Sequence, residues 1–288
     1  MLDERKKCPI CKLDKFKILY SLSYNDDLIQ KFLKKYYKER ISQYLNELAA
    51  YNYVILECLN CSLKFQKYIP NEKFSKIFYE QIIDDEESKN KMKKLPASRH
   101  WKDFELINKI IKKNNQNISI FEFGSGNGEW ACEAKKLNYD TTVYEYSIDR
   151  IETLKKKGLN VCDNINLCKK KFDIIFSNQV FEHIPNPAET LELLMPLLKK
   201  DGYILLKFPS SFMFKRKLKD NYQPKKDCAH PLEHINILNR KAFIHLTKSL
   251  NLEVSISNRH SIFNYKKYLR YFKDFFYFNQ VLIRNKKN

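Results

Sequence analysis

The glycines constrain this chain more than any other feature, since three of its five glycines fall at positions 124, 126 and 128. A chain of this length would on average contain about twenty glycines. The three stand in "ISIFEFGSGNGEWACEAKKL", where a β-prone apolar run precedes them and a segment of helical spacing follows. A second β-prone run, "TTVYEY", comes next. Strand, glycine loop, helix and strand in this order predict a nucleotide-binding βαβ unit, in which bare backbone approaches a ligand closely.

The residues around the loop distinguish between two kinds of cofactor. A dinucleotide fold requires the pattern GxGxxG, which needs a glycine at position 129, but this chain has Glu129 there. Glu122, just before the loop, would repel a pyrophosphate and attract the amino group of S-adenosylmethionine. Glu145 lies 21 residues after Gly124, near the spacing at which an acid accepts hydrogen bonds from the ribose hydroxyls. The sequence therefore favours S-adenosylmethionine.

The other two glycines belong to the same α/β pattern. Gly158 ends a helical segment before "LNVCDN", a predicted third strand that closes with Asp163. "KFDIIFSNQ" predicts a fourth strand, and "AETLELLMPLLKK" (residues 188–200) predicts a helix that ends before Gly202 and the strand "YILLKFP".

Four of the eight cysteines form two CxxC pairs, which are Cys8 with Cys11 and Cys58 with Cys61. Two such turns supply four thiolates in tetrahedral geometry, which predicts a structural Zn²⁺ site. The stretch between them, "LIQKFLKKYYKERISQYLNELAAY", has helical periodicity and no glycine or proline. We expect a zinc-binding module with a helical insertion at residues 1–85 and a second domain at residues 86–288, divided in the charged stretch near residues 84–94.

The sequence resembles the class I S-adenosylmethionine-dependent methyltransferases in "FEFGSGNG", "VYEYS", "FDIIFSNQVFEHIPNP" and "LLKKDGYILLKFP", over about residues 98–288. The second CxxC turn with "SLKFQKYIP" resembles the zinc module of the branch that contains sugar C-methyltransferases. The resemblance implies a Rossmann-like α/β fold, whose seven-stranded, mostly parallel sheet has its last strand antiparallel. It identifies "LEVSISN" and "FNQVLIRNKK" as the final strands, with "HSIFNYKKYLRYFKDFF" inserted between them. That branch also has a further C-terminal domain without a counterpart in this sequence, so the acceptor atom is left open.

The resemblance also implies a set of cofactor-binding residues, which line the loop, the ends of the second and third strands and the end of the fourth. These residues are Glu122, Gly124, Ser125, Gly126, Gly128, Glu145, Tyr146, Asp163, Asn164, Asn178 and Gln179.

Methyl transfer from a sulfonium is an in-line displacement, in which the protein aligns the acceptor and, where needed, removes its proton. His183, in "VFEHIPNP", follows the fourth strand at the sheet edge where such folds bind ligands. Glu233 and His234, in "CAHPLEHINIL", match a Glu-His pair that sugar-modifying relatives use in catalysis. These three are the candidate catalytic residues, whereas His230 and His245 are expected to be structural.

A formal net charge of +19 favours anionic partners, but the lysines occur in short runs along the whole chain, without arginine clustering. Residues 210–239 mix aromatics with lysines and are expected to cover the acceptor pocket, where their charge suits a phosphate-bearing acceptor. The start, "MLDERKKCPIC", has no apolar signal segment, and no run is long enough to span a membrane, which predicts a cytoplasmic protein.

The sequence thus predicts a zinc-containing, S-adenosylmethionine-dependent methyltransferase. The expected acceptor is a small polar molecule, such as a sugar, a nucleotide-sugar or a surface-glycan precursor. The main alternative is an RNA methyltransferase that grips nucleic acid through its basic surface and zinc module. The other is a non-catalytic protein that binds S-adenosylmethionine.

Overall fold

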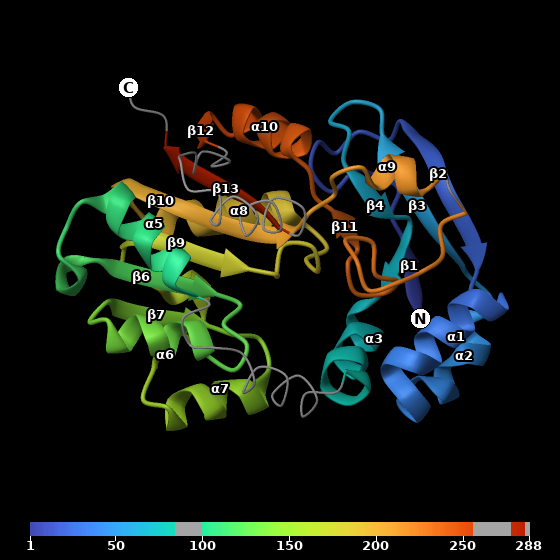
Figure 1. The fold of residues 1–288 in the computed structure, drawn as a ribbon, viewed down its shortest axis with the longest axis horizontal. Helices are drawn as coiled ribbons and strands as arrows, with labels where there is room; N and C mark the ends of the chain where they lie inside the picture. The colour runs from blue at the N-terminus through green and yellow to red at the C-terminus, as the bar shows by residue number, and fades with distance from the viewer. Residues whose placement is uncertain (84–99, 220, 256–277, 286–288) are drawn as a thin grey trace, which may run out of the picture.

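The computed structural model describes residues 1–83, 100–219, 221–255 and 278–285 (Figure 1). The expected domain boundary near residues 84–94 and the segment inserted at residues 260–276 lie outside these ranges. Within the described residues, none of the helices has the length and apolar character needed to cross a bilayer.

A seven-stranded sheet forms the larger half of the molecule, with the strand order β12-β13-β10-β9-β6-β7-β8. The strand β13 runs antiparallel to β10 and β12, and the other neighbours are parallel. The predicted fold class, including the antiparallel last strand, is therefore confirmed. The strands are β6 (Ser119–Phe123), β7 (Asp140–Tyr144), β8 (Asn160–Val161), β9 (Phe172–Asn178), β10 (Leu198–Pro209), β12 (Leu252–Ser255) and β13 (Phe278–Asn285).

Helices cover both faces of this sheet, because the central strands are apolar on both sides (Figure 1). Successive strand residues point to opposite faces, so that Ile120 packs with α5 (Trp101–Ile111) and α6 (Glu129–Lys136). Its neighbour Phe121 packs with α8 (Pro187–Leu194) and α10 (Arg240–Ser249). The helix α7 (Ile148–Lys156) packs through Leu154 against Val143 of β7.

The helix predicted over residues 188–200 is shorter than expected. The helix α8 ends at Leu194, a 3-10 turn covers Met195–Leu197, and β10 begins at Leu198. Pro196 accounts for the difference, because its ring removes a backbone donor and disfavours a continuous α-helix.

A four-stranded sheet with the order β11-β4-β3-β2 forms the smaller half. Its first three strands in sequence come from the N-terminal region, whereas β11 comes from residues 236–237 and pairs antiparallel with β4. The helical insertion between the CxxC pairs is confirmed, and it packs beside this sheet (Figure 1). The elements are β1 (Leu2–Glu4), β2 (Phe16–Ser23), α1 (Asp27–Tyr37), a 3-10 helix (Lys38–Tyr44), α2 (Leu45–Leu48), β3 (Asn52–Cys58), β4 (Lys64–Gln66), β5 (Tyr68–Pro70), α3 (Glu72–Ile77), a π-helical turn (Phe78–Ile82), α9 (Phe214–Lys217) and β11 (Asn236–Ile237).

The two halves share one hydrophobic core. Cys8 and Phe65 of the N-terminal half belong to the same buried cluster as Phe181, Phe208 and Phe243 of the larger half. The N-terminal half is thus packed against the seven-stranded sheet, with β11 between the two (Figure 1).

Asp173, on β9, connects three segments at the amino end of the large sheet. Its carboxylate accepts hydrogen bonds from the backbone and hydroxyl of Ser119 and from the ammonium groups of Lys113 and Lys199, at 2.7 to 2.9 Å. Burial would raise the pKa of Asp173, but these hydrogen bonds outweigh burial and hold the pKa well below its usual range.

We predict that Asp173→Asn lowers the free energy of unfolding by about 2 kcal/mol at neutral pH, a modest value because both lysines are half exposed. The Asp173 contribution is present above the unfolded-state pKa of about 3.9 and is lost as the pH falls through the lower folded-state pKa. Urea unfolding at pH 6 and pH 3 should therefore show a smaller difference between the two proteins at pH 3. The exposed Asp201→Asn is the matched control, and an equal effect of both variants would contradict the prediction.

Candidate functional site

The loop between β6 and α6 is built by its glycines. Gly124, Gly126 and Gly128 have φ angles of +77°, +55° and +77°, in the left-handed region that favours glycine. A Cβ at Gly124 would lie 2.5 Å from a methyl group of Val180, and one at Gly128 would collide with Leu154. A Cβ at Gly126 would meet nothing within 4 Å. Packing therefore requires the outer two glycines, whereas the middle one faces open space on the side where a ligand can lie.

Glu145, directly after β7, folds back onto this loop. Its Oε2 accepts a hydrogen bond from the backbone N–H of Gly126 at 2.7 Å. Its Oε1 accepts from the backbone N–H groups of Tyr146 and Ser147, at 2.9 and 3.3 Å. The structure thus brings the predicted acid and the predicted loop into direct contact at the carboxyl edge of the sheet.

Several buried polar atoms around the loop have no hydrogen-bond partner among the residues that the structure describes. They are Oε2 of Glu122, Oγ of Ser125, Oδ1 of Asn127 and Nε2 of Gln179. Burial, followed by repulsion from Glu129, raises the pKa of Glu122 well above its usual value. Such atoms normally find partners in native proteins, so this group fits a ligand that carries both a cationic and an anionic group.

The remaining predicted cofactor residues lie at the ends of neighbouring strands. Asn178 ends β9, and Gln179 follows it with a φ of +59°. Asp163 and Asn164 follow β8, where Asp163 pairs with Lys155 at 3.0 Å and Asn164 caps a short 3-10 turn. Tyr146 is 74% exposed. These residues share the carboxyl edge with the loop, but no hydrogen bond to the loop is recorded for them among the described residues.

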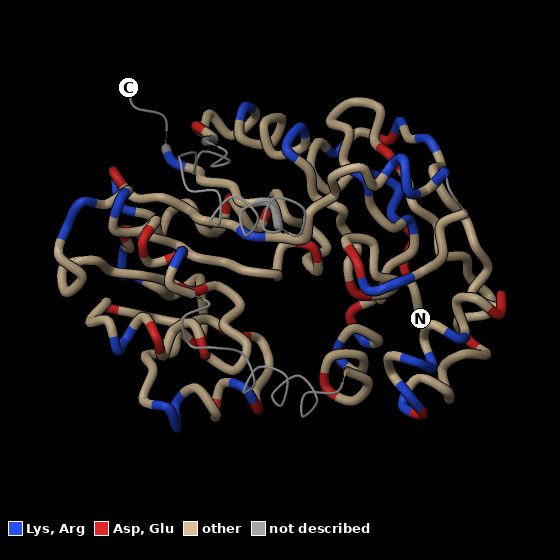
Figure 2. Tube along the Cα trace, in the orientation of Figure 1, with Lys and Arg blue, Asp and Glu red and all other residues tan. Residues whose placement is uncertain are grey.

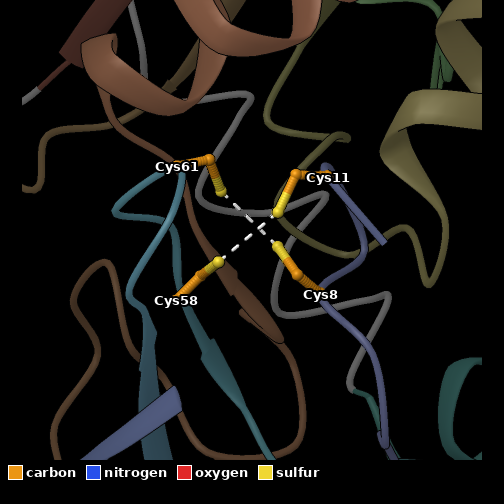
Figure 3. Close-up of side chains that lie close together, drawn as sticks. All are labelled: Cys8, Cys11, Cys58 and Cys61. Atoms are coloured by element: carbon orange, nitrogen blue, oxygen red, sulfur yellow. Dashed lines mark hydrogen bonds between the residues drawn. The ribbon is translucent and has the colours of Figure 1, made fainter. Parts of the chain in front are cut away.

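The four paired cysteines converge on one point (Figure 3). The sulfur atoms of Cys8 and Cys61 are 3.5 Å apart, those of Cys11 and Cys58 are 3.4 Å apart, and all four lie within 4.8 Å of one another. A tetrahedral ion with bonds to sulfur of about 2.3 Å separates its ligands by about 3.8 Å. The four positions therefore match the requirements of a tetrahedral tetrathiolate metal centre.

The two CxxC turns have the same backbone geometry. In each, the residue after the second cysteine, Lys12 or Ser62, is left-handed and donates its N–H to the carbonyl of the first cysteine at 3.0 Å. The hydrogen bond from Cys61 is the main cause that lowers the pKa of Cys8 to about 5, and two backbone N–H groups add to it. Both effects favour the thiolate, which is the form that binds metals.

A second polar cluster lies where the two halves meet. Glu182 and His183 come from the turn after β9, and His230, Glu233 and His234 come from the segment before β11. The ring centroids of His183 and His234 are 4.9 Å apart. The structure therefore brings the three predicted catalytic residues, His183, Glu233 and His234, into one cluster, although about 50 positions separate His183 from the other two.

Burial keeps these histidines neutral. It lowers the pKa of His234 to about 4 and that of His230 to about 3, and it lowers the pKa of His183 well below its usual value. Neutral imidazoles can accept a proton or bind a metal ion. His245 is separate from the cluster and approaches the side-chain amide of Asn60 at 3.3 Å.

The N-terminal half holds this segment in position through one buried glutamine. Gln66 donates hydrogen bonds from Nε2 to the carbonyls of His230 and His234, at 2.9 and 3.0 Å. Its Oε1 accepts from the N–H of Leu232 at 3.3 Å, and Leu232 has a strained φ of +67°. An unfavourable backbone conformation next to Glu233 and His234 is thus stabilised from another strand.

Further residues that the sequence did not reveal complete the cluster. Tyr37, at the end of α1, donates its hydroxyl to Glu233 at 2.5 Å and lies 3.0 Å from Nε2 of His230. Arg5 donates to Asn236 at 2.8 Å and to the carbonyl of Pro185 at 3.0 Å, which ties the two segments together. No motif marks these residues, because their roles depend on contacts across more than 150 positions.

Three kinds of comparison relate the chain to known proteins. A family model described as "Methyltransferase domain" matches residues 96–255. The curated protein "Methyltransferase str2" from Strobilurus tenacellus is 27% identical over 97 residues, which cover 32% of this chain and about a third (35%) of that protein.

Solved structures resemble the chain at lower identity. The plantazolicin methyltransferase BpumL in complex with SAH is 19% identical, with 63% of this chain and 80% of that chain covered and a TM-score of 0.46. An S-adenosylmethionine-dependent methyltransferase from Clostridium acetobutylicum is 14% identical, with 75% and 98% covered and a TM-score of 0.47. Magnesium protoporphyrin IX methyltransferase from Synechocystis, with bound SAH, is 9% identical, with 66% and 84% covered and a TM-score of 0.45.

We predict that Gln66→Leu lowers the free energy of unfolding by about 2 kcal/mol, since it leaves two buried carbonyls without a donor. Urea unfolding of the variant and the wild type measures the effect.

The exposed Gln116→Leu is the control and should change stability little. An equal loss of stability in Gln66→Leu and Gln116→Leu would contradict the prediction.

Proposed function

This chain belongs to the family of methyltransferase domains, and on that premise we propose that it transfers the methyl group of S-adenosylmethionine to a small polar acceptor. The observation that carries the proposal is the set of buried, unpartnered polar atoms around the glycine loop. A protein that had lost its cofactor site would have no reason to keep Glu122 buried and unpaired beside that loop, since such a group is costly. This argues against the non-catalytic alternative.

Each part of the cofactor would contact particular atoms of this set. Its amino group would donate to Glu122, which would then be held ionised, and its carboxylate would accept from Ser125 and Gln179. Glu145 would exchange its hydrogen bond with the Gly126 N–H for the ribose hydroxyls. Asp163 and Asn164 would flank the adenine, beside Tyr146, and Asn178 would face the methionine moiety.

The acceptor would bind at the cluster that contains His183, Glu233 and His234. The cofactor supplies an electrophilic methyl group when bound, so this chain's task is to hold the acceptor atom in line with it. An acceptor that must lose a proton would give it to a neutral imidazole, for which His234 is the candidate. Glu233 would anchor the acceptor, and Tyr37 fixes the position of its carboxylate.

The chemistry of the segment before the cluster supports a sugar, a nucleotide-sugar or a surface-glycan precursor as the acceptor. A surface cavity of about 380 Å³ is lined by polar residues, including Lys217, Tyr222 and Lys225. Tyr222 contacts Asp227, whose carbonyl contacts the His234 ring, so this cavity is linked to the cluster. Two lysines beside it suit a phosphate-bearing acceptor.

RNA is the second candidate acceptor, and the net charge of +19 favours it. Figure 2 shows lysines and arginines spread over both halves of the described chain and interspersed with acidic residues. Lys17, Lys64 and Lys215 surround Glu57 at 3.0 to 3.5 Å, so their charge is partly compensated within the protein. Binding to bulk RNA that falls steeply with added salt, together with its methylation, would favour this candidate over a small acceptor.

We also propose that Cys8, Cys11, Cys58 and Cys61 hold a structural Zn²⁺ ion. The separations of their sulfur atoms support this, as does the matching backbone geometry of both turns. Four thiolates fill a tetrahedral ion completely and leave no position for a substrate, which is typical of structural zinc.

We predict that S-adenosylmethionine binds the wild-type protein and that Glu145→Ala weakens the binding about tenfold or more, because two hydrogen bonds to the ribose are lost. Isothermal titration calorimetry measures both. The exposed Glu152→Ala should bind like the wild type. Absence of binding by the wild type at millimolar cofactor would refute the enzyme proposal.

For zinc, we expect elemental analysis of purified protein to find at least one ion per chain, and Cys58→Ser to contain about one ion fewer than the wild type. The variant should also lose cooperative unfolding of the N-terminal half, followed by near-UV circular dichroism, because the metal contributes folding free energy. Cys168→Ser, which changes a cysteine outside the cluster, is the control. A folded wild-type protein without metal would contradict the assignment.

A further inference from the structure

A second group of metal-ligating side chains lies apart from the cysteines, at the acceptor cluster. Glu182, His183 and His234 each offer one ligand atom, and the three atoms lie within 4.8 Å of one another. The Oε1 atom of Glu182 and the Nε2 atom of His183 are 3.9 Å apart. Two adjacent residues of one turn thus meet a third residue from the segment before β11.

The carboxylate of Glu182 has no partner that would justify its burial. The residue is 1% exposed, and among the described residues neither of its side-chain oxygens has a hydrogen-bond partner. A buried carboxylate of this kind is costly unless a proton or a cation neutralises it, and the two nearby imidazoles favour the cation.

Both histidines are oriented as metal-binding histidines usually are. Nδ1 of His183 lies 3.1 Å from the hydroxyl of Tyr79, and Nδ1 of His234 is hydrogen-bonded to the carbonyl of Asp227. Metal-bound histidines commonly use the second ring nitrogen in this way, which fixes the ring and directs the first nitrogen to the ion. With Nδ1 held in this way, Nε2 is the ligand atom that each ring offers.

We infer that Glu182, His183 and His234 bind a divalent transition-metal ion at the acceptor end of the site. Two imidazoles and one carboxylate suit Zn²⁺, Mn²⁺ or Fe²⁺. With ligand bonds of about 2.1 Å, a tetrahedral ion separates its ligands by about 3.4 Å, so the side chains close inward on binding. Three protein ligands leave at least one coordination position open.

The role of the ion, though not its binding, rests on the proposed function. One carboxylate leaves a divalent ion with a net positive charge, which attracts an acceptor hydroxyl to the open position. Coordination lowers the pKa of that hydroxyl, so its proton passes to solvent. The oxygen then forms a bond to the methyl carbon while the carbon–sulfur bond breaks, and its electron pair stays on sulfur. His183 and His234 act in this form as ligands, and the ion replaces them in activating the acceptor.

The neighbouring group of His230, Glu233 and His234 also brings three potential ligand atoms close together. Nδ1 of His230 has no partner among the described residues, but the carboxylate of Glu233 is already engaged, since it accepts a hydrogen bond from the Tyr37 hydroxyl at 2.5 Å. The unpartnered Glu182 is thus the better ligand.

The experiment is a titration with Mn²⁺ of the full chain loaded with one equivalent of Zn²⁺, which the four thiolates bind in preference to the Glu182 site. The electron paramagnetic resonance signal of free Mn²⁺ follows the binding. Mn²⁺ prefers oxygen and nitrogen ligands to thiolates, so the cysteine centre does not respond. We expect about one Mn²⁺ per chain and binding at least about tenfold weaker in Glu182→Gln, His183→Asn and His234→Asn. His245→Asn, which changes a histidine outside the cluster, should bind like the wild type.

Three outcomes would overturn the inference. They are absence of saturable Mn²⁺ binding by the folded wild type, retention of binding in all three ligand variants, or loss of binding in Glu233→Gln while Glu182→Gln retains it. Circular dichroism confirms that each variant is folded, and agreement among three separate variants guards against a folding defect in one. Calorimetry with S-adenosylmethionine on the same samples tests the proposed function separately, because cofactor binding without Mn²⁺ binding would refute only the metal site.

Discussion

The pairing of β11 with β4 is the interaction on which the rest of this structure depends. It takes residues 236 and 237, which lie between β10 and β12 of the large sheet in sequence, and makes them the edge of the N-terminal sheet. The segment before them is thereby held against Gln66, whose three hydrogen bonds stabilise a left-handed Leu232. Such a conformation persists only where the surroundings over-determine it, and here those surroundings belong to the other half of the molecule. The position of Glu233 and His234 is therefore a property of both halves together.

Two buried carboxylates mark the two ends of the site. Glu122, which precedes the glycine loop, and Glu182, which follows β9, are both buried. Among the described residues, each retains at least one carboxylate oxygen without a hydrogen-bond partner. Unpaired buried acids are disfavoured because desolvation penalises the charge, so each raises the question of which cation compensates it. At Glu122 the loop geometry favours a ligand ammonium, and at Glu182 the adjacent imidazoles favour a metal ion. A buried carboxylate without a partner is thus compensated by a different cation at each end, and the neighbouring donor atoms determine which cation fits.

The sequence predicted those parts of the fold that depend on local signals. The glycine loop, the order of strands and helices around it and the two CxxC turns each have a pattern over a few residues, and the structure contains all of them. Pro196 limited α8 in a way that apolar periodicity alone did not indicate. Tyr37, Gln66 and Arg5 could not be predicted, because an isolated tyrosine, glutamine or arginine has no pattern and acquires its role only when distant segments meet. The grouping of His183 with His234 was predictable only through the resemblance to methyltransferases, since spacing alone does not bring the two together.

The cysteine centre and the cluster of His183, Glu233 and His234 are connected through one short strand. Cys61 lies three residues before β4 begins at Lys64, and the same strand ends at Gln66, which holds the segment with Glu233 and His234. The turn that carries Cys61 is closed by the Ser62 N–H, and the Leu63 carbonyl accepts a hydrogen bond from the Cys58 N–H at 2.8 Å, so the backbone is fixed from the sulfur atoms to the strand. A metal bound by the four thiolates would rigidify the backbone at the start of this segment, before β4. The N-terminal half is then not an independent attachment, because the strand that it orders is the one that holds the segment with Glu233 and His234.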